Sequence, residues 1–356
     1  MTGEGAERGQ EERTEPVSKP ASEPASTLWQ PGATLATLKA RAEMLAAMRA
    51  FFQVRGVMEV DTPMLSRHAT VDRHIESFAA RPGAAPNAPP RADDPPRWLH
   101  TSPEFAMKRL LAAGSGPIYQ LCHVFRAEEA GRHHNPEFLM LEWYRPGWDY
   151  HRLMTEVEAL LQALGIGRGR HFPRLSYRDA FLRYGGVEPF RAEISVLQRG
   201  LAEHGVSVPD SKQDHSHARD YWLDLWMSMV IGPKLGDPTP CFLYDFPTTQ
   251  AALAKVRGGD QPVAERFELF WQGLELANGF NELTDAGEQE LRFRFDTHWR
   301  QARNRAMPPY DTHFLDALDA GLPESAGVAL GVDRLLMLML KLPDIASAMA
   351  FGADRA

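Results

Sequence analysis

The chain has 356 residues, 44% of them hydrophobic, and carries a formal net charge of −8 at pH 7. This length supplies a large core in one domain or two. The negative charge argues against a surface built mainly to hold nucleic acid, which leaves only a local basic patch open. The longest apolar run, 335–342, is too short to span a bilayer, and residues 1–30 lack the apolar stretch of a signal peptide, so we expect a cytosolic protein without a membrane segment.

Two segments are too biased in composition to form core elements. Residues 1–27 are rich in Glu, Ser, Pro and Gly, so burial cannot offset the entropy of ordering them, and we expect a disordered acidic tail over 1–30. One folded domain is expected over 31–356, with a Pro/Ala-rich surface loop at 79–97. The two cysteines, Cys122 and Cys241, lie in strand-like apolar runs, which favours buried free thiols over a disulfide or a metal site.

Hydrophobic periodicity predicts the elements in chain order. Helices are expected at 35–54, 104–112, 150–164, 195–204, 218–230 and 285–305, and strands at 57–60, 118–126, 138–145, 241–246, 266–271 and 274–279. A final strand and helix occupy 328–340. Because strands return next to one another as hairpins, the pattern favours an α+β fold, an antiparallel β-sheet flanked by helices.

The strand at 138–145 carries the first candidate site residues. Alternation places Phe138, Met140, Glu142 and Tyr144 on one face, where a ring, a carboxylate and a phenol in a row suit a flat base at one end and an ammonium at the other. A solvated strand face is the plainer alternative. The preceding strand ends at Arg126, and the loop 127–135 holds two glutamates and adjacent histidines. Because no third His or Cys lies at a zinc spacing, we favour phosphate and adenine contacts there over zinc.

Residues 267–280 read as a hairpin with Gln272 and Gly273 at the turn, which would set Trp271 against Leu274, Phe270 against Glu275 and Glu268 against Ala277. In that register Glu268 and Glu275 are diagonal neighbours on one face. Two carboxylates this close repel unless a cation lies between them, which suits magnesium. Two solvent-facing glutamates at a strand edge are the alternative. We expect the backbone to bend beyond Gly279, so the direction of Asn278 and Glu282 is not predicted.

The segment 327–334 is a glycine-punctuated strand that enters a helix near Asp333. It places Arg334 in the first helical turn beside free backbone N–H groups, which is a favourable anion site. A plain helix start is the ordinary reading of such a pattern. Together with Arg126, however, Arg334 can clamp a polyphosphate from two sides and neutralise a leaving pyrophosphate.

These segments, in this order, resemble the three signature motifs of class II aminoacyl-tRNA synthetases. The phrases FRAEEAGRHHNPEFLMLEWYRP, ELANGFNELTDA and GVALGVDRLLML are similar to the lysine-activating branch, and the likeness covers about 36–356. It is also similar to shortened paralogues of lysyl-tRNA synthetase that attach (R)-β-lysine to a lysine side chain of elongation factor P. The resemblance therefore implies an ATP-dependent, AMP-forming ligase that uses Mg²⁺, with elongation factor P as its protein partner. The helix and strand that end at Pro63 match the dimer motif of the class, so a homodimer is expected.

The resemblance also implies residue roles. Arg126 and Arg334 would be catalytic, and Phe138 would stack on adenine. The ATP-binding residues would be Arg126, Glu128, His134, Asn135, Phe138, Glu275, Leu276, Gly331 and Arg334. Magnesium would be held by Glu268 and Glu275. The lysine-type substrate would contact Ser102 and Glu104 at its inner amine and Tyr144 and Glu282 at its terminal ammonium, with Glu142, Asn278 and Ala329 beside it.

Two features distinguish a ligase from a synthetase in this comparison. The segment before the first helix is too short for the anticodon-binding barrel of a lysyl-tRNA synthetase, which argues against transfer RNA as the acceptor. Ala329 stands where synthetases of this branch have glycine, and its methyl group would disfavour α-lysine by about 1 to 3 kcal/mol. The chain departs from the pattern at Ala127, where Asn is usual, and in the 79–97 loop. The alternatives are a stand-alone lysyl-adenylate former that charges tRNA or a small acceptor, and a non-enzymatic lysine sensor, which would have broken motifs.

Overall fold

The computed structural model describes residues 28–81, 95–207 and 219–356. The expected tail over 1–30 lies outside the described residues except for its last three positions, and so does the middle of the expected 79–97 loop. Both ends of that loop belong to strands of a small antiparallel sheet with the order β2-β4-β3, formed by β2 (Leu65–Ser66), β3 (Ala79–Ala80) and β4 (Arg97–Leu99). In the described ranges no helix is long and apolar enough to cross a membrane.

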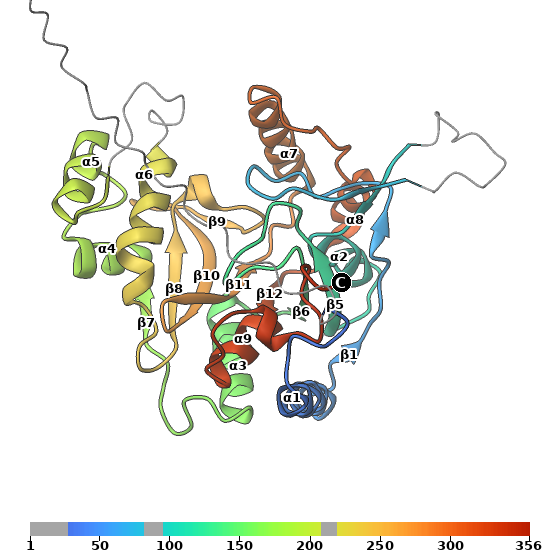
Figure 1. Cartoon of the computed structure of the whole chain (residues 1–356). Coiled ribbons are helices and arrows are strands. Elements are labelled where there is room, and N and C mark those ends of the chain that lie inside the picture. The colour runs from blue at the N-terminus through green and yellow to red at the C-terminus, as the bar shows by residue number, and fades with distance from the viewer. Residues whose placement is uncertain (1–27, 82–94, 208–218) are drawn as a thin grey trace, which may run out of the picture.

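A large, mostly antiparallel sheet forms the centre of the molecule (Figure 1). Its order is β1-β5-β6-β12-β11-β10-β8-β7, and β9 adds to β10. Only β1 with β5 and β7 with β8 pair in parallel among its described strands. The strands are β1 (Met58–Glu59), β5 (Ile118–Phe125), β6 (Glu137–Pro146), β7 (Arg174–Ser176), β8 (Cys241–Phe246), β9 (Val256–Arg257), β10 (Val263–Trp271), β11 (Leu274–Asn281) and β12 (Ser325–Gly331). The expected α+β class is confirmed.

Helices cover both faces of this sheet and one of its ends. On one side lie α1 (Leu35–Gln53), α3 (Tyr150–Ala163) and α9 (Val332–Met339), and on the other lie α2 (Glu104–Ala112), α7 (Ala286–Gln301) and α8 (Thr312–Gly321) (Figure 1). At the β7–β8 end lie α4 (Tyr177–Gly185), α5 (Ile194–Glu203) and α6 (Arg219–Trp226), which continues into a π-helical turn, Met227–Ile231. Short 3₁₀ turns occupy Gly232–Lys234, Thr248–Gln250 and Ala346–Ala348.

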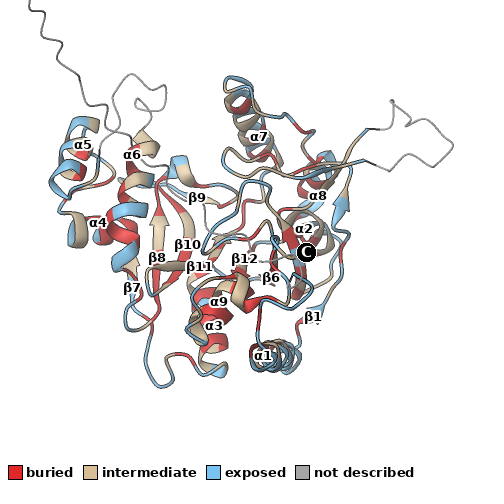
Figure 2. Cartoon of the chain, in the orientation of Figure 1, coloured by how far each residue is buried: buried red, intermediate tan, exposed pale blue. Residues whose placement is uncertain are grey.

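The local sequence explains the helix that begins the fold. Thr34 caps α1 because its hydroxyl accepts a 3.1 Å hydrogen bond from the backbone N–H of Thr37. Helical spacing then buries Met44, Met48 and Phe52 against α3 and the sheet. Figure 2 shows the buried residues gathered between the sheet and its helices.

Most predicted elements are confirmed within a few residues, and the differences have local causes. The helices at 177–185 and 312–321 were not predicted, although each has a capping side chain, Ser176 and Asp311. The helix expected at 285–305 ends at Gln301. Cys122 and Cys241 are buried free thiols, as expected.

The hairpin of β10 and β11 departs from its predicted register. Gln272 and Gly273 form the turn with φ of 51° and 76°, and Trp271 faces Leu274 as expected. The predicted pairing of Glu268 with Ala277 is wrong, because a β-bulge sets Glu268 opposite Asn278. The expected bend beyond Gly279 is also absent, since β11 remains paired with β12 as far as Asn281.

Candidate active site

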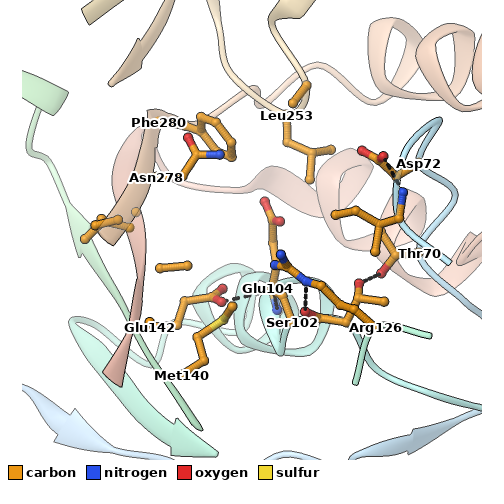
Figure 3. A pocket seen from close by; sticks show the side chains of 18 of the residues that line it. Thr70, Asp72, Ser102, Glu104, Arg126, Met140, Glu142, Leu253, Asn278 and Phe280 are labelled. Carbon is orange, nitrogen blue, oxygen red and sulfur yellow. Dashed lines mark hydrogen bonds between the residues drawn. The ribbon is translucent and has the colours of Figure 1, made fainter. Parts of the chain in front are cut away.

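A cavity of about 350 Å³ opens on the sheet face that carries α2 and α7, and it gathers most of the predicted site residues. It is lined by Ser102, Glu104, Arg126, His134, Asn135, Phe138, Glu142, Tyr144, Glu275, Leu276, Asn278, Glu282, Ala329, Gly331 and Arg334. Figure 3 shows Arg126, Glu104 and Glu142 around one space, with Asn278 at the sheet. Glu128 and Glu268 do not line this cavity. Glu128 is exposed and lies 3.4 Å from Arg305 Nη1.

Strand β6 divides its side chains as alternation predicted. Leu139, Leu141 and Trp143 enter the hydrophobic core under α3 and α9, whereas Glu142 and Tyr144 line the cavity. The pleat of one strand thus anchors the sheet and presents polar groups on its other face. A solvated strand face is excluded here, because Glu142 and Tyr144 are each only 2% exposed.

Arg126 and Arg334 converge on the cavity from distant parts of the chain. Arg126 follows β5, donates from Nη1 to Glu129 Oε1 at 3.1 Å, and places its guanidinium 5.2 Å from the centre of the Phe138 ring. Arg334, in the first turn of α9, donates to the carbonyl oxygens of His133 at 3.1 Å and Glu275 at 3.0 Å. These backbone contacts fix Arg334 against the 127–135 loop and β11 while it remains at the cavity wall.

His134 and Asn135 sit between the two arginines in sequence but have different surroundings. Burial and the charge of Arg334 lower the pKa of His134, so the ring is neutral near pH 7. Asn135 donates from Nδ2 to the Glu137 carbonyl at 2.6 Å and accepts from the Ala353 N–H at 3.0 Å. Its amide is thus already engaged in holding the C-terminal segment against the site.

One end of the cavity concentrates carboxylates. Glu142 accepts a 2.6 Å hydrogen bond from the Tyr144 hydroxyl at Oε1 and a 3.0 Å bond from the Ser102 hydroxyl at Oε2. Burial, reinforced by the charge of Glu104, raises the pKa of Glu142 to about 8. An ammonium placed here would relieve this repulsion, so the cluster is suited to a cationic group.

Glu282 lies beside this cluster and is 1% exposed. Its Oε2 is 2.5 Å from Lys108 Nζ, while its Oε1 has no side-chain hydrogen-bond partner within the described ranges. Burial raises the pKa of Glu282 to about 7, against the opposing influence of the Lys108 charge. A buried acceptor without a partner is costly, which makes Oε1 a candidate contact for a ligand N–H group.

Strand β12 lines one wall of the cavity with residues that have small side chains or none. Gly327, Ala329 and Gly331 line the cavity, and Ala329 pairs with Glu142 on one side and Asn278 on the other. A side chain larger than methyl at 329 would therefore enter the space between the polar groups of two neighbouring strands.

Glu268 and Glu275 border a second cavity of about 770 Å³ that shares Glu275 with the first. Burial and then the charge of Glu275 raise the pKa of Glu268 to about 8, and Arg266 forms an ion pair with Glu268. No cluster of three or more His, Cys, Asp or Glu side chains suited to a metal occurs in the part of the chain that the structure describes. A carboxylate pair fits Mg²⁺, which commonly takes one or two carboxylates together with phosphates and water.

Sequence reasoning missed three residues that shape the site. Lys108 bridges Glu104 and Glu282, Arg266 holds Glu268, and Gly327 leaves room for Tyr144. The spacing of Glu104 and Lys108 by four residues on a helix was a readable signal for an ion pair. No signal in the sequence could have predicted the contacts of Gly327, because they depend on a neighbouring strand.

Comparison with known proteins agrees with this geometry. A family model described as tRNA synthetases class II (D, K and N) matches residues 28–355. A relative from Erwinia tasmaniensis, named elongation factor P--(R)-beta-lysine ligase, is 48% identical over 92% of this chain and 98% of its own length. A protein of the same name from Pectobacterium atrosepticum is 47% identical over 93% of this chain and 99% of its own length. Another from Pseudoalteromonas translucida is 48% identical over 92% of this chain and 99% of its own length.

Proposed function

Because the chain belongs to the class II aminoacyl-tRNA synthetase family, and within it to the group of elongation factor P--(R)-beta-lysine ligases, we propose that it activates (R)-β-lysine with ATP and transfers it to a lysine side chain of elongation factor P. The observation that carries the proposal is the convergence of Arg126 and Arg334 on one cavity with a carboxylate cluster at its end.

In this proposal the arginine end of the cavity binds ATP. The adenine stacks on Phe138, and the phosphates extend between Arg126 and Arg334. His134, Leu276 and Gly331 border the nucleotide, and the neutral His134 ring adds no charge of its own. Asn135 supports the site through the C-terminal segment, and Glu128 would need to turn inward from its exposed position to contact ATP.

The carboxylate end binds the amino-acid substrate. Glu282 Oε1 and the Tyr144 hydroxyl receive the terminal ammonium, and Ser102 and Glu104 face the second amine. Glu142 and Asn278 complete the surroundings from neighbouring strands. This arrangement directs the substrate carboxylate toward the arginine end, where the reacting phosphate lies.

The reaction needs no general base in its first step. The substrate carboxylate, ionised at neutral pH, forms a bond to the α-phosphorus of ATP while the bond to the pyrophosphate oxygen breaks. Arg126 and Arg334 neutralise the charge that develops on the leaving pyrophosphate. The acceptor amine, after losing a proton, then attacks the acyl carbon and AMP leaves.

Glu268 and Glu275 would hold Mg²⁺ at the edge of the nucleotide site. The ion, when bound, supplies charge neutralisation and orientation for the β- and γ-phosphates. The ion pair with Arg266 keeps Glu268 beside Glu275 before the metal arrives.

We also propose a homodimer and a cytosolic location. Leu35 at the start of α1 and Val54 just after its end are 75% and 79% exposed, and Met58, Met64 and Leu65 are also exposed. Exposed apolar side chains along this helix and the strand after it suit an interface between two copies. Sedimentation velocity of the purified chain should give a dimer, and a monomer at micromolar concentration would contradict it.

The test of the main proposal is acceptor identification. The protein is incubated with ATP, Mg²⁺, (R)-β-lysine and elongation factor P, and the factor is weighed by mass spectrometry. We expect an increase by one β-lysyl group, located on one lysine side chain. An unchanged factor together with charged transfer RNA would overturn the proposal in favour of a stand-alone synthetase.

A further inference from the structure

Lys108 places an ammonium group inside the carboxylate end of the cavity wall. Its side chain is 1% exposed, and Nζ lies 2.6 Å from Glu104 Oε1 and 2.5 Å from Glu282 Oε2. The ring of Phe314 on α8 closes the other side, with its centre 5.6 Å from Nζ. A buried ammonium is tolerated only where such partners offset its desolvation.

A buried ion pair contributes little net stability to a fold, because apolar residues of similar volume usually stabilise a core as well or better. Lys108 instead touches two of the three carboxylates that face the proposed substrate. When all three carboxyl groups are ionised, Glu104, Glu142 and Glu282 carry three negative charges, and Lys108 reduces the net charge of the cluster to −2. A lysine-type substrate brings two ammonium groups to this end, so its charge matches what Lys108 leaves.

We propose that Lys108 is a positioning and specificity-determining residue, an internal cation that holds the Glu104 and Glu282 carboxyl groups together and in line so that the pocket accepts two substrate ammonium groups. The inference rests on the proposed function, because it concerns the amino-acid end of that site. Lys108 itself does not contact the reacting atoms.

The surroundings of Lys108 explain why it stays charged. Burial alone would lower the pKa of Lys108, but the charges and hydrogen bonds of Glu104 and Glu282 outweigh burial and raise it. Further titratable groups at this end, among the described residues, are Glu142 and Tyr144 on β6 and the thiol of Cys122 on β5, which feels the charge of Glu142. Without the lysine, three buried carboxyl groups face one another with no cation among them, and the pocket takes up a further proton that an incoming ammonium must then displace.

The decisive comparison is Lys108→Met against Arg109→Met. Both changes remove a cation from α2, but Arg109 is exposed. Substrate-dependent pyrophosphate exchange is measured across pH 6 to about 9 with varied (R)-β-lysine and varied ATP. For Lys108→Met we expect the KM for β-lysine at pH 7 to rise about tenfold or more while the KM for ATP stays within about twofold. We also expect the acidic limb of kcat/KM for β-lysine to move upward by about one pH unit.

The same KM and the same acidic limb in Lys108→Met and Arg109→Met would overturn the inference. A residue with only a structural role would lower folded protein and kcat without moving the acidic limb. Absence of exchange in the unaltered protein with any lysine isomer would instead overturn the proposed function, so the two failures are distinguishable.

A double variant keeps the test decisive if Lys108→Met does not fold. Lys108→Met with Glu282→Gln removes one buried cation and one buried carboxylate, so the net charge of the cluster is unchanged. We expect the double variant to bind β-lysine more tightly than Glu282→Gln alone, in which the cluster keeps a single net negative charge. Weaker or equal binding by the double variant would overturn the inference.

Discussion

The backbone of Gly327 lies directly against the ring of Tyr144. A Cβ built at position 327 would stand 2.5 Å from Glu282 Oε1 and closer still to the Tyr144 ring, so the absence of a side chain there gives both residues their places. The two groups proposed to receive the terminal ammonium thus depend on one glycine of a neighbouring strand.

Gly327→Ala should therefore impair amino-acid use. Overpacking of this kind costs about 1 to 3 kcal/mol, and we expect a rise of roughly tenfold to a hundredfold in the KM for β-lysine, with the KM for ATP little changed. Steady-state pyrophosphate exchange measures both. Gly258→Ala is the matched control, because a Cβ at 258 meets nothing within 4 Å. Equal behaviour of the two variants would show that Tyr144 and Glu282 can shift without consequence.

Ala329→Gly should alter the choice between lysine isomers. Removing the methyl between Glu142 and Asn278 enlarges the pocket by one carbon, so we expect kcat/KM for α-lysine to rise by about tenfold relative to that for (R)-β-lysine. Competition between the two isomers, read by mass spectrometry of the acceptor, measures the ratio. An unchanged ratio would remove Ala329 as the source of selectivity.

Stability of the substrate-free protein should depend on pH through Glu142. Its pKa is raised from the ordinary 4.5 to about 8, mainly by burial, so between these values the folded state holds a proton that the unfolded chain has released. The free energy of unfolding contributed by this group therefore falls as the pH rises through that window. Thermal melting from pH 5 to about 9 measures the slope, and Glu142→Gln should flatten it. A slope unchanged in the variant would assign the effect to other groups.

Mg²⁺ affinity should rise with pH. The pKa of Glu268 is raised to about 8 by burial and by Glu275, so near pH 7 a metal must displace a proton from this pair. We expect the Mg²⁺ concentration for half-maximal exchange to fall between pH 6 and about 8, and Glu268→Gln to raise it by about tenfold or more. Glu265→Gln, on the same strand but paired with Arg257, is the control and should leave it unchanged.

Arg41 and Asp333 join α1 to α9 across the core, and their ion pair should matter for stability. Asp333 is fully buried, pairs with Arg41, and accepts a 2.6 Å hydrogen bond from the Leu139 N–H. Arg41→Met leaves a buried carboxylate without its cation, so we expect a loss of about 3 to 5 kcal/mol in the free energy of unfolding. Arg49→Met on the same helix, which breaks the exposed pair with Glu59 of β1, should cost about 1 kcal/mol or less. Urea unfolding compares the two.

The sequence by itself determined the elements and most of the cavity wall. Alternation along 138–145 assigned Glu142 and Tyr144 to one face because a strand has a fixed period of two, and the helix start near Asp333 placed Arg334 correctly at the cavity. The local sequence was enough to predict these positions, since each depends only on residues a few places away in the chain. The roles of the lining residues came from resemblance to the class II synthetases, which the family match supports at the level of the fold.

Only the tertiary structure decided how distant residues meet. The bulge beside Leu269 moved Glu268 opposite Asn278. Packing across the layers also brought Glu282, which follows β11, against Lys108 on α2. The physical reason is that register and buried charge pairing arise from contacts across strands and layers. Period and propensity act only along the chain, so they cannot specify which buried charge finds which partner.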